Sequence, residues 1–137
     1  MRYTVNNIID FLKDQALIDN IDPNTNVCDD IGLAGDDFDE MLEAYSRIFS
    51  VDMDDYLWYF HSEEEGWNGI GGSFFSPPDK QVKRIPITPS MLTEFANGGK
   101  WDIKYPEHTL SKRRYDLYIN LFLLLVVLIW IIQKFTN

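Results

Sequence analysis

Cysteine is nearly absent from this chain of 137 residues, and histidine is scarce. The single cysteine, Cys28, excludes a disulfide framework and a cluster of thiolate ligands, and it fits a reducing compartment. We expect Cys28 to be a small buried hydrophobic residue in a loop. The two histidines, His61 and His108, lie in no recognisable motif with a serine or cysteine nucleophile, and we expect His61 to contact the last carbonyls of a short helix. The sequence therefore predicts neither an enzyme nor a cofactor.

Basic residues are also few. The chain has 12 lysines and arginines against 22 aspartates and glutamates, which gives a net charge of −10. Because nucleic-acid binding depends on a basic surface, this balance disfavours a nucleic-acid partner and favours a protein partner with basic patches. The acidity is concentrated in residues 1–66, which hold 17 of the acidic and 3 of the basic side chains.

The acidic and glycine-rich segments match no ligand-binding motif. A calcium-binding loop needs oxygen ligands and a glycine at fixed positions, but the window of residues 29–40 places Ile31, Leu33 and Ala34 there. The glycines at positions 66, 69, 71 and 72 are followed by no Lys-Ser or Lys-Thr pair of a phosphate-binding loop, so we interpret them as turn residues. We therefore predict no metal site.

The strongest helical pattern covers residues 35–49. Its large apolar residues recur every three or four positions, which gathers them on one face of an α-helix: Phe38, Met41, Leu42, Tyr45, Ile48 and Phe49. The opposite face is acidic and is formed by Asp36, Asp37, Asp39, Glu40 and Glu43. Acids in a first turn complement the helix dipole, so this face is either an ordinary solvated surface or a docking surface for a basic partner.

Other helices are expected on both sides of this one. Thr4 is the expected N-cap of a helix that ends near residues 15–16, and residues 56–60 favour a short apolar helix. Thr88 supplies a capping hydroxyl for a later helix, which two glycines stop at residues 98–99.

A β-hairpin is predicted between these helices. Residues 72–75 and 82–87 read as two extended segments separated by a proline-containing loop. The predicted fold class is therefore α+β: helices over residues 4–62, a hairpin plus helix over residues 70–98, and one domain over residues 1–110. A basic hairpin patch of Lys80, Lys83 and Arg84 is either a polar strand face or a contact with anionic lipid.

The end of the chain is hydrophobic on every side of a helix. Residues 117–132 contain one strongly polar residue, Asn120, and residues 121–132 are uninterrupted apolar sequence. A chain of this size cannot bury such a helix, so we predict a membrane span over residues 117–135. The residues expected in the bilayer include Leu117, Leu121, Leu125, Leu128, Trp130 and Ile132.

Basic residues before the span predict its orientation. Lys112, Arg113 and Arg114 precede it, whereas Lys134 is the one basic residue after its apolar run of residues 121–132. By the positive-inside rule, residues 111–137 form a tail anchor that leaves the N-terminal domain in the cytoplasm.

The segment around residues 31–52 resembles the second helix of an acyl carrier protein. The resemblance rests on Ile31-Gly32-Leu33, on the long acidic helix that closes on Ile48-Phe49, and on the Val51-Asp52 that follows, and with the neighbouring helices it covers residues 4–62. In carriers an Asp-Ser-Leu motif opens this helix and the serine bears the phosphopantetheine arm. Here the aligned triplet is Asp36-Asp37-Phe38, so Asp37 stands at the serine position without a hydroxyl.

Later segments are foreign to carriers. Ile85-Pro86-Ile87-Thr88-Pro89 and Gly98-Gly99-Lys100-Trp101 are similar to a small uncharacterised bacterial family of acyl-carrier-like proteins that lack the serine. This resemblance implies a carrier-like helical bundle with an added hairpin and helix, and it transfers no catalytic residue.

These patterns lead to one expected function and two alternatives. We expect a single-pass protein of the bacterial inner membrane that docks a basic cytoplasmic or membrane protein through its acidic helix, without catalysis. The first alternative is a carrier modified at an unconventional serine, for which Ser46, Ser50 and Ser90 are the candidates. The second is a small membrane regulator that acts through its transmembrane helix, for which the acidic domain provides solubility.

Overall fold

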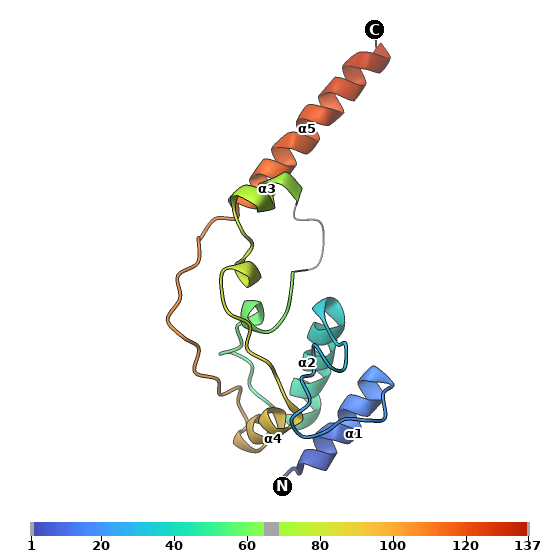
Figure 1. The fold of residues 1–137 in the computed structure, drawn as a ribbon, viewed down its shortest axis with the longest axis vertical. Coiled ribbons are helices and arrows are strands. Elements are labelled where there is room, and N and C mark those ends of the chain that lie inside the picture. The colour runs from blue at the N-terminus through green and yellow to red at the C-terminus, as the bar shows by residue number, and fades with distance from the viewer. Residues whose placement is uncertain (1, 65–68, 137) are drawn as a thin grey trace.

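The computed structural model describes residues 2–64 and 69–136. These residues form five α-helices and two short 3-10 helices, α1 (Val5–Ala16), α2 (Gly35–Phe49), η1 (Trp58–Phe60), α3 (Gly69–Phe74), η2 (Pro78–Lys80), α4 (Pro89–Gly98) and α5 (Tyr115–Thr136). Helices α1, α2 and α4 lie together near the N-terminus, and α5 projects from the opposite end with α3 beside its base (Figure 1).

The helices predicted from local signals are confirmed. Helix α1 starts after Thr4, whose backbone N–H donates to the side-chain oxygen of Asn7 over 2.8 Å. Helix α2 covers the predicted residues, although Ile48, expected on the buried face, is 54% exposed. Helix α4 follows Thr88, whose hydroxyl accepts a hydrogen bond from the backbone of Met91, and it ends at Gly99 with φ +73°. Capping residues therefore fix these ends as the sequence indicates.

The predicted β-hairpin is wrong, and the fold class is helical rather than α+β. The described residues form no strand, and their one isolated bridge joins Asp52 to Lys100. The first expected strand lies mostly in α3, which packs against α5. The second, residues 82–87, is extended but pairs with two separate segments: Ile85 donates to the carbonyl of Phe60 at the end of η1, and Ile87 accepts from Val27 in the loop between α1 and α2. Extended segments paired by single hydrogen bonds do not form a ladder.

The expected short helix at residues 56–60 is reduced to the 3-10 turn η1. Before this turn, the carboxylate of Asp52 accepts a hydrogen bond from the backbone N–H of Asp54 over 2.9 Å. Phe60, the last residue of this turn, is fully buried in the interior.

One continuous core unites α1, α2 and α4 with the loops between them. It contains Ile8, Leu12, Phe38, Met41, Tyr45, Leu92 and Trp101 among its most buried members. The long loop between α1 and α2 is anchored by Ile21, Val27 and Ile31, and Cys28 is buried there as expected. Burial of these apolar side chains is the main source of the domain's stability.

The two ends of this helical core are fastened to each other. The side-chain amide of Asn97, in α4, accepts from the backbone N–H of Tyr3 over 2.7 Å and donates to its carbonyl over 2.9 Å. These residues lie 94 positions apart in the sequence. The start of α1 is therefore held against α4, with which it shares a contact surface.

After α4 the chain runs in extended conformation along the outside of the domain to the base of α5 (Figure 1). Trp101 opens this segment with its indole buried in the core, and its backbone N–H donates to the carbonyl of Asp52 over 2.8 Å. Helix α5 has 22 residues, and its most hydrophobic window of 18 residues has a mean hydropathy of 2.3, so it is long and apolar enough to cross a membrane.

Candidate functional site

The five acids of the predicted docking face all lie exposed on α2. They are Asp36, Asp37, Asp39, Glu40 and Glu43, whereas Phe38, Met41, Leu42 and Tyr45 of the same helix are buried. Asp36 and Asp37 stand in the first turn, where the helix dipole favours negative charge. The helix therefore presents a continuous acidic surface, named here the α2 acidic face.

Asp37 lies at the opening of a small cavity of about 250 Å³ between α2 and the end of α1. Ile31 and Leu33 from the connecting loop and Gln15 from α1 also line this cavity. The loop reaches the helix through Gly35, whose φ of +55° lies in the left-handed region that glycine adopts without steric cost. The carboxylate of Asp37 thus faces solvent at the start of the helix, where it is available to a partner.

An apolar groove of about 380 Å³ borders the α2 acidic face. Asp39 and Glu43 lie on its acidic side, and Met53, Tyr56 and Trp58 line the rest of it together with two other residues of α2. The hydroxyl oxygen of Tyr56 is buried and has no hydrogen-bond partner in the described part of the chain. Burial, followed by the negative charge of Asp39, raises the pKa of Tyr56, so this phenol stays neutral.

Two of the three candidate serines have structural roles. The hydroxyl of Ser46 donates to the carbonyl of Glu43 over 3.0 Å, and that of Ser90 donates to the carbonyl of Pro23 over 2.9 Å. Ser50 is exposed at the C-cap of α2 with φ +54°. The exposed Ser50 is therefore the more accessible position for a modification.

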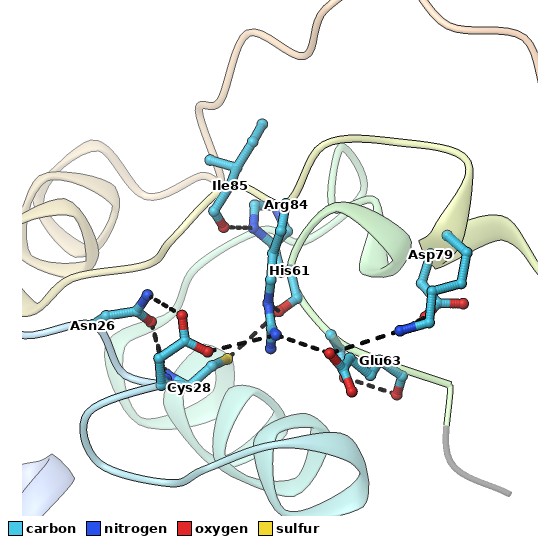
Figure 2. A network of polar contacts seen from close by, with 10 residues as sticks. Asn26, Cys28, His61, Glu63, Asp79, Arg84 and Ile85 are labelled. Carbon is cyan, nitrogen blue, oxygen red and sulfur yellow. Dashed lines mark hydrogen bonds and ion pairs between the residues drawn. The ribbon is translucent and has the colours of Figure 1, made fainter.

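Two residues of the predicted basic hairpin patch, Lys80 and Arg84, are paired with acids, whereas Lys83 is exposed. The guanidinium of Arg84 lies between two segments of the chain (Figure 2). Its Nη1 is 3.5 Å from the carboxylate of Asp29 and 3.3 Å from that of Glu63. Its Nε also donates to the carbonyl of His61 over 3.2 Å. Lys80 approaches Glu63 at 3.8 Å. Arg84 therefore links the α1–α2 loop to the segment that follows η1.

The side chain of His61 is buried, and the residue lies beside Arg84. Its Nδ1 lies 2.9 Å from the carbonyl oxygen of Ile85, and its Nε2 lies 2.8 Å from the hydroxyl of Tyr105. A carbonyl can only accept, so Nδ1 carries the proton and Nε2 accepts from Tyr105. Burial lowers the pKa of His61 to about 4, with the positive charge of Arg84 acting in the same direction. The expected contact with the carbonyls of its own helix is therefore wrong.

Of the three basic residues before α5, two are exposed and one is paired with carboxylates. Lys112 and Arg113 are exposed, but Arg114 Nη2 lies 2.8 Å from Glu64 and 2.7 Å from Asp116. The side chain of Asp116 is 3% exposed. Glu64, Arg114 and Asp116, named here the base triad, fix the start of α5 to the chain that precedes α3.

Helix α5 leaves its apolar side chains exposed on all sides, and only 6% of its most hydrophobic window is buried. The residues predicted to face the bilayer are 45–62% exposed: Leu117, Leu121, Leu125, Leu128, Trp130 and Ile132. Such a surface fits a lipid environment.

The contact between α3 and α5 was missed in the sequence. Gly71 lies so close to α5 that a Cβ atom would stand 2.0 Å from the carbonyl oxygen of Asp116. Its N–H donates to the side-chain oxygen of Asn120 over 2.8 Å. Two features of the sequence could have indicated this contact: the glycine-rich segment and the lone polar residue Asn120 in an apolar helix. Small residues and polar side chains often occur where helices pack together in membranes.

No group of three histidine, cysteine or carboxylate side chains suitable for a metal occurs in residues 2–64 and 69–136. The molecule belongs to the class of small acidic helical domains joined to an apolar C-terminal helix. Residues 2–104 match the family described as "Protein of unknown function (DUF1493)", and the chain belongs to this family. The expectation of an uncharacterised family is thus confirmed. No curated protein and no solved structure matches the chain.

Proposed function

We propose that this protein is a membrane-tethered docking protein whose α2 acidic face binds a basic surface on a cytoplasmic or membrane protein. The observation that carries the proposal is the exposure of all five acids on one helix of a domain that is joined to an apolar helix. Helix α5 is the anchor, and the exposed Lys112 and Arg113 hold its N-terminal end in the cytoplasm.

Charge supports a recognition role for this face. The acids are concentrated in the first half of the chain, and complementary charge accelerates encounter with a basic partner. The apolar groove beside Asp39 and Glu43 offers Met53, Tyr56 and Trp58 as contact area next to the charges. Aromatic residues of this kind contribute strongly to protein–protein binding.

The finer proposal is a degenerate acyl-carrier surface. Asp37 stands in the first turn of α2, where a carrier would hold its modified serine, and a carboxylate cannot accept the phosphopantetheine group. On this proposal the helix has the docking role of a carrier helix and lacks its attachment chemistry. The protein acts through contacts and catalyses no reaction.

Affinity capture from native membranes tests the docking role. The test protein is the full chain with Asp36→Asn, Asp37→Asn, Glu40→Gln and Glu43→Gln, and captured partners are identified after crosslinking. We expect the wild-type chain to capture a basic protein in a salt-sensitive manner, because exposed charges are screened by added salt. The four substitutions should abolish this capture.

A matched control removes the same number of charges elsewhere. Asp10, Asp14, Asp19 and Glu94 are all exposed outside α2, so Asp10→Asn, Asp14→Asn, Asp19→Asn and Glu94→Gln change the net charge equally. This control should retain the partner. Equal capture by the wild type and both variants at every salt concentration would show that the α2 acidic face is an ordinary solvated surface.

A further inference from the structure

Large apolar side chains are exposed on and just after α3, beside the base of α5. Phe74 is 73% exposed, Ile70 is 52% exposed, and Phe75 is 45% exposed. Exposed apolar patches of this kind mark interaction or membrane surfaces. Helix α3 is too short to be stable by itself, so its position is determined by what it packs against.

The apolar surface of α3 continues that of α5. Ile70 lines an almost entirely apolar hollow of about 230 Å³ with Leu123, Leu124 and Val127. At the other end of α3, the ring of Phe75 lies 5.3 Å from the ring of Tyr115, measured between centroids. The apolar surface of α5 is therefore continuous with Ile70, whereas Phe74 and Phe75 also border Arg113 and Asp116 at the base of α5.

The packing that holds α3 in place is close and specific. Gly69 and Gly71 both face α5 without a Cβ, and Asn120 accepts a hydrogen bond from the backbone of Gly71. Asn120 is the strongly polar residue within the apolar segment 117–132, and this bond satisfies its side-chain oxygen. Helix α3 is thus fixed to the first two turns of α5.

Those turns contain the N-terminal boundary of the predicted span, which begins at residue 117. Residues 115–120 rise about 9 Å along the helix at 1.5 Å per residue. This rise is similar to the depth of one headgroup layer, which is about 5–8 Å on each side of the hydrocarbon core. The charges of the base triad at the same end are paired with one another, which lowers the cost of placing them near lipid.

We infer that α3 and Phe75 form a second membrane contact, seated in the interfacial layer of the same phospholipid bilayer that α5 crosses. This inference rests on the membrane tether of the proposed function. The domain then stands on the bilayer through two packed segments, and its orientation relative to the membrane plane is set by the α3–α5 contact.

Site-directed spin labelling of the full chain in vesicles of phosphatidylethanolamine and phosphatidylglycerol tests the contact. In a Cys28→Ala background, a nitroxide is attached through Phe74→Cys or, independently, through Ile70→Cys. Leu17, which is 91% exposed at the end of α1, provides the aqueous control through Leu17→Cys. Leu128→Cys provides the label within the span. Collisions with oxygen report lipid, and collisions with a soluble nickel complex report water.

We expect the oxygen-to-nickel collision ratio at Phe74 and Ile70 to shift from the aqueous value of Leu17 toward the lipid value of Leu128. A lipid value at Leu128 with aqueous values at Phe74 and Ile70 would overturn the inference and leave the tether intact. An aqueous value at Leu128 would overturn both. If the label at position 74 collides with neither reagent, the side chain is covered by protein, such as a second copy of the chain. That result would also overturn the inference.

Discussion

The imidazole Nε2 of His61 and the hydroxyl of Tyr105 lie 2.8 Å apart in the interior, although the two residues are separated by 44 positions in the sequence. The same hydroxyl accepts from the indole Nε1 of Trp101 over 2.8 Å and from the backbone of Leu57 over 3.3 Å. With Nδ1 of His61 donating to Ile85, every polar atom in this cluster has a defined role. One phenol therefore joins three segments of the chain.

Acidification should destabilise the protein through His61. In the unfolded chain this group binds a proton near pH 6.5, whereas burial lowers its pKa to about 4 in the folded protein. The unfolded state then binds more protons between these values, so stability is complete above pH 6.5 and falls as the pH decreases toward 4. The loss attributable to His61 reaches about 3 kcal/mol. Denaturant unfolding across this range measures it, and a midpoint above pH 6 for the assigned imidazole in NMR titration would contradict it.

Removal of the Tyr105 hydroxyl should cost more than loss of one ordinary hydrogen bond. Tyr105→Phe leaves the indole N–H of Trp101 and the Nε2 of His61 without their partner in the interior, and we expect a loss on the order of 3 kcal/mol in the free energy of unfolding. Urea denaturation of the full chain in detergent measures this change. Tyr3→Phe is the matched control, since the ring of Tyr3 packs on Phe49 and its hydroxyl forms no hydrogen bond with described residues. A neutral Tyr105→Phe would contradict the network.

The α3–α5 contact should not tolerate a side chain at position 71. Gly71→Ala introduces a Cβ 2.0 Å from the carbonyl oxygen of Asp116, so α3 must move and the bond to Asn120 is lost. Hydrogen exchange measured by mass spectrometry should show faster exchange of the amides in residues 69–75. Gly98→Ala is the control, because a Cβ there meets nothing within 4 Å. Unchanged protection in Gly71→Ala would mean that the two helices are not in close contact.

Breaking the base triad should destabilise the start of α5. Arg114→Gln leaves the carboxylate of Asp116, whose side chain is 3% exposed, without its cation. Because Arg114 itself is 29% exposed, we expect a loss of about 2 kcal/mol, below the value for fully buried pairs. Adding Asp116→Asn should recover part of the loss, since it removes the unpaired charge. Thermal unfolding in lipid nanodiscs compares these variants with Arg113→Gln, and equal melting temperatures for the two single variants would contradict the prediction.

Local signals predicted much of the helical architecture. The bounds of α2 follow from its apolar period, and Thr88 and Gly99 mark the limits of α4 through capping geometry that depends on neighbouring residues only. The exposure of the acids on α2 follows from the same period. Elements whose stability depends on neighbouring residues can thus be predicted from the sequence.

The errors arise where distant residues decide the structure. The sequence of α3, Gly-Ile-Gly-Gly-Ser-Phe, has poor helix propensity, and it becomes a helix against α5, some 50 positions later. Likewise, the burial of His61 depends on Tyr105, and the pairing of Arg114 depends on Glu64. None of these partners lies within a turn or two of the residue it contacts, so a periodic pattern does not reveal them.

The hydrogen bonds between Tyr3 and the side chain of Asn97 can form only after α4 has been synthesised. A ribosome adds residues from the N-terminus at about 5–20 per second, so the 94 positions between these residues represent about 5–20 s. Throughout that interval the surface of α1 that later contacts α4 lacks this partner. The nascent domain is therefore incomplete until α4 emerges, which makes this the period in which chaperones can reach that surface.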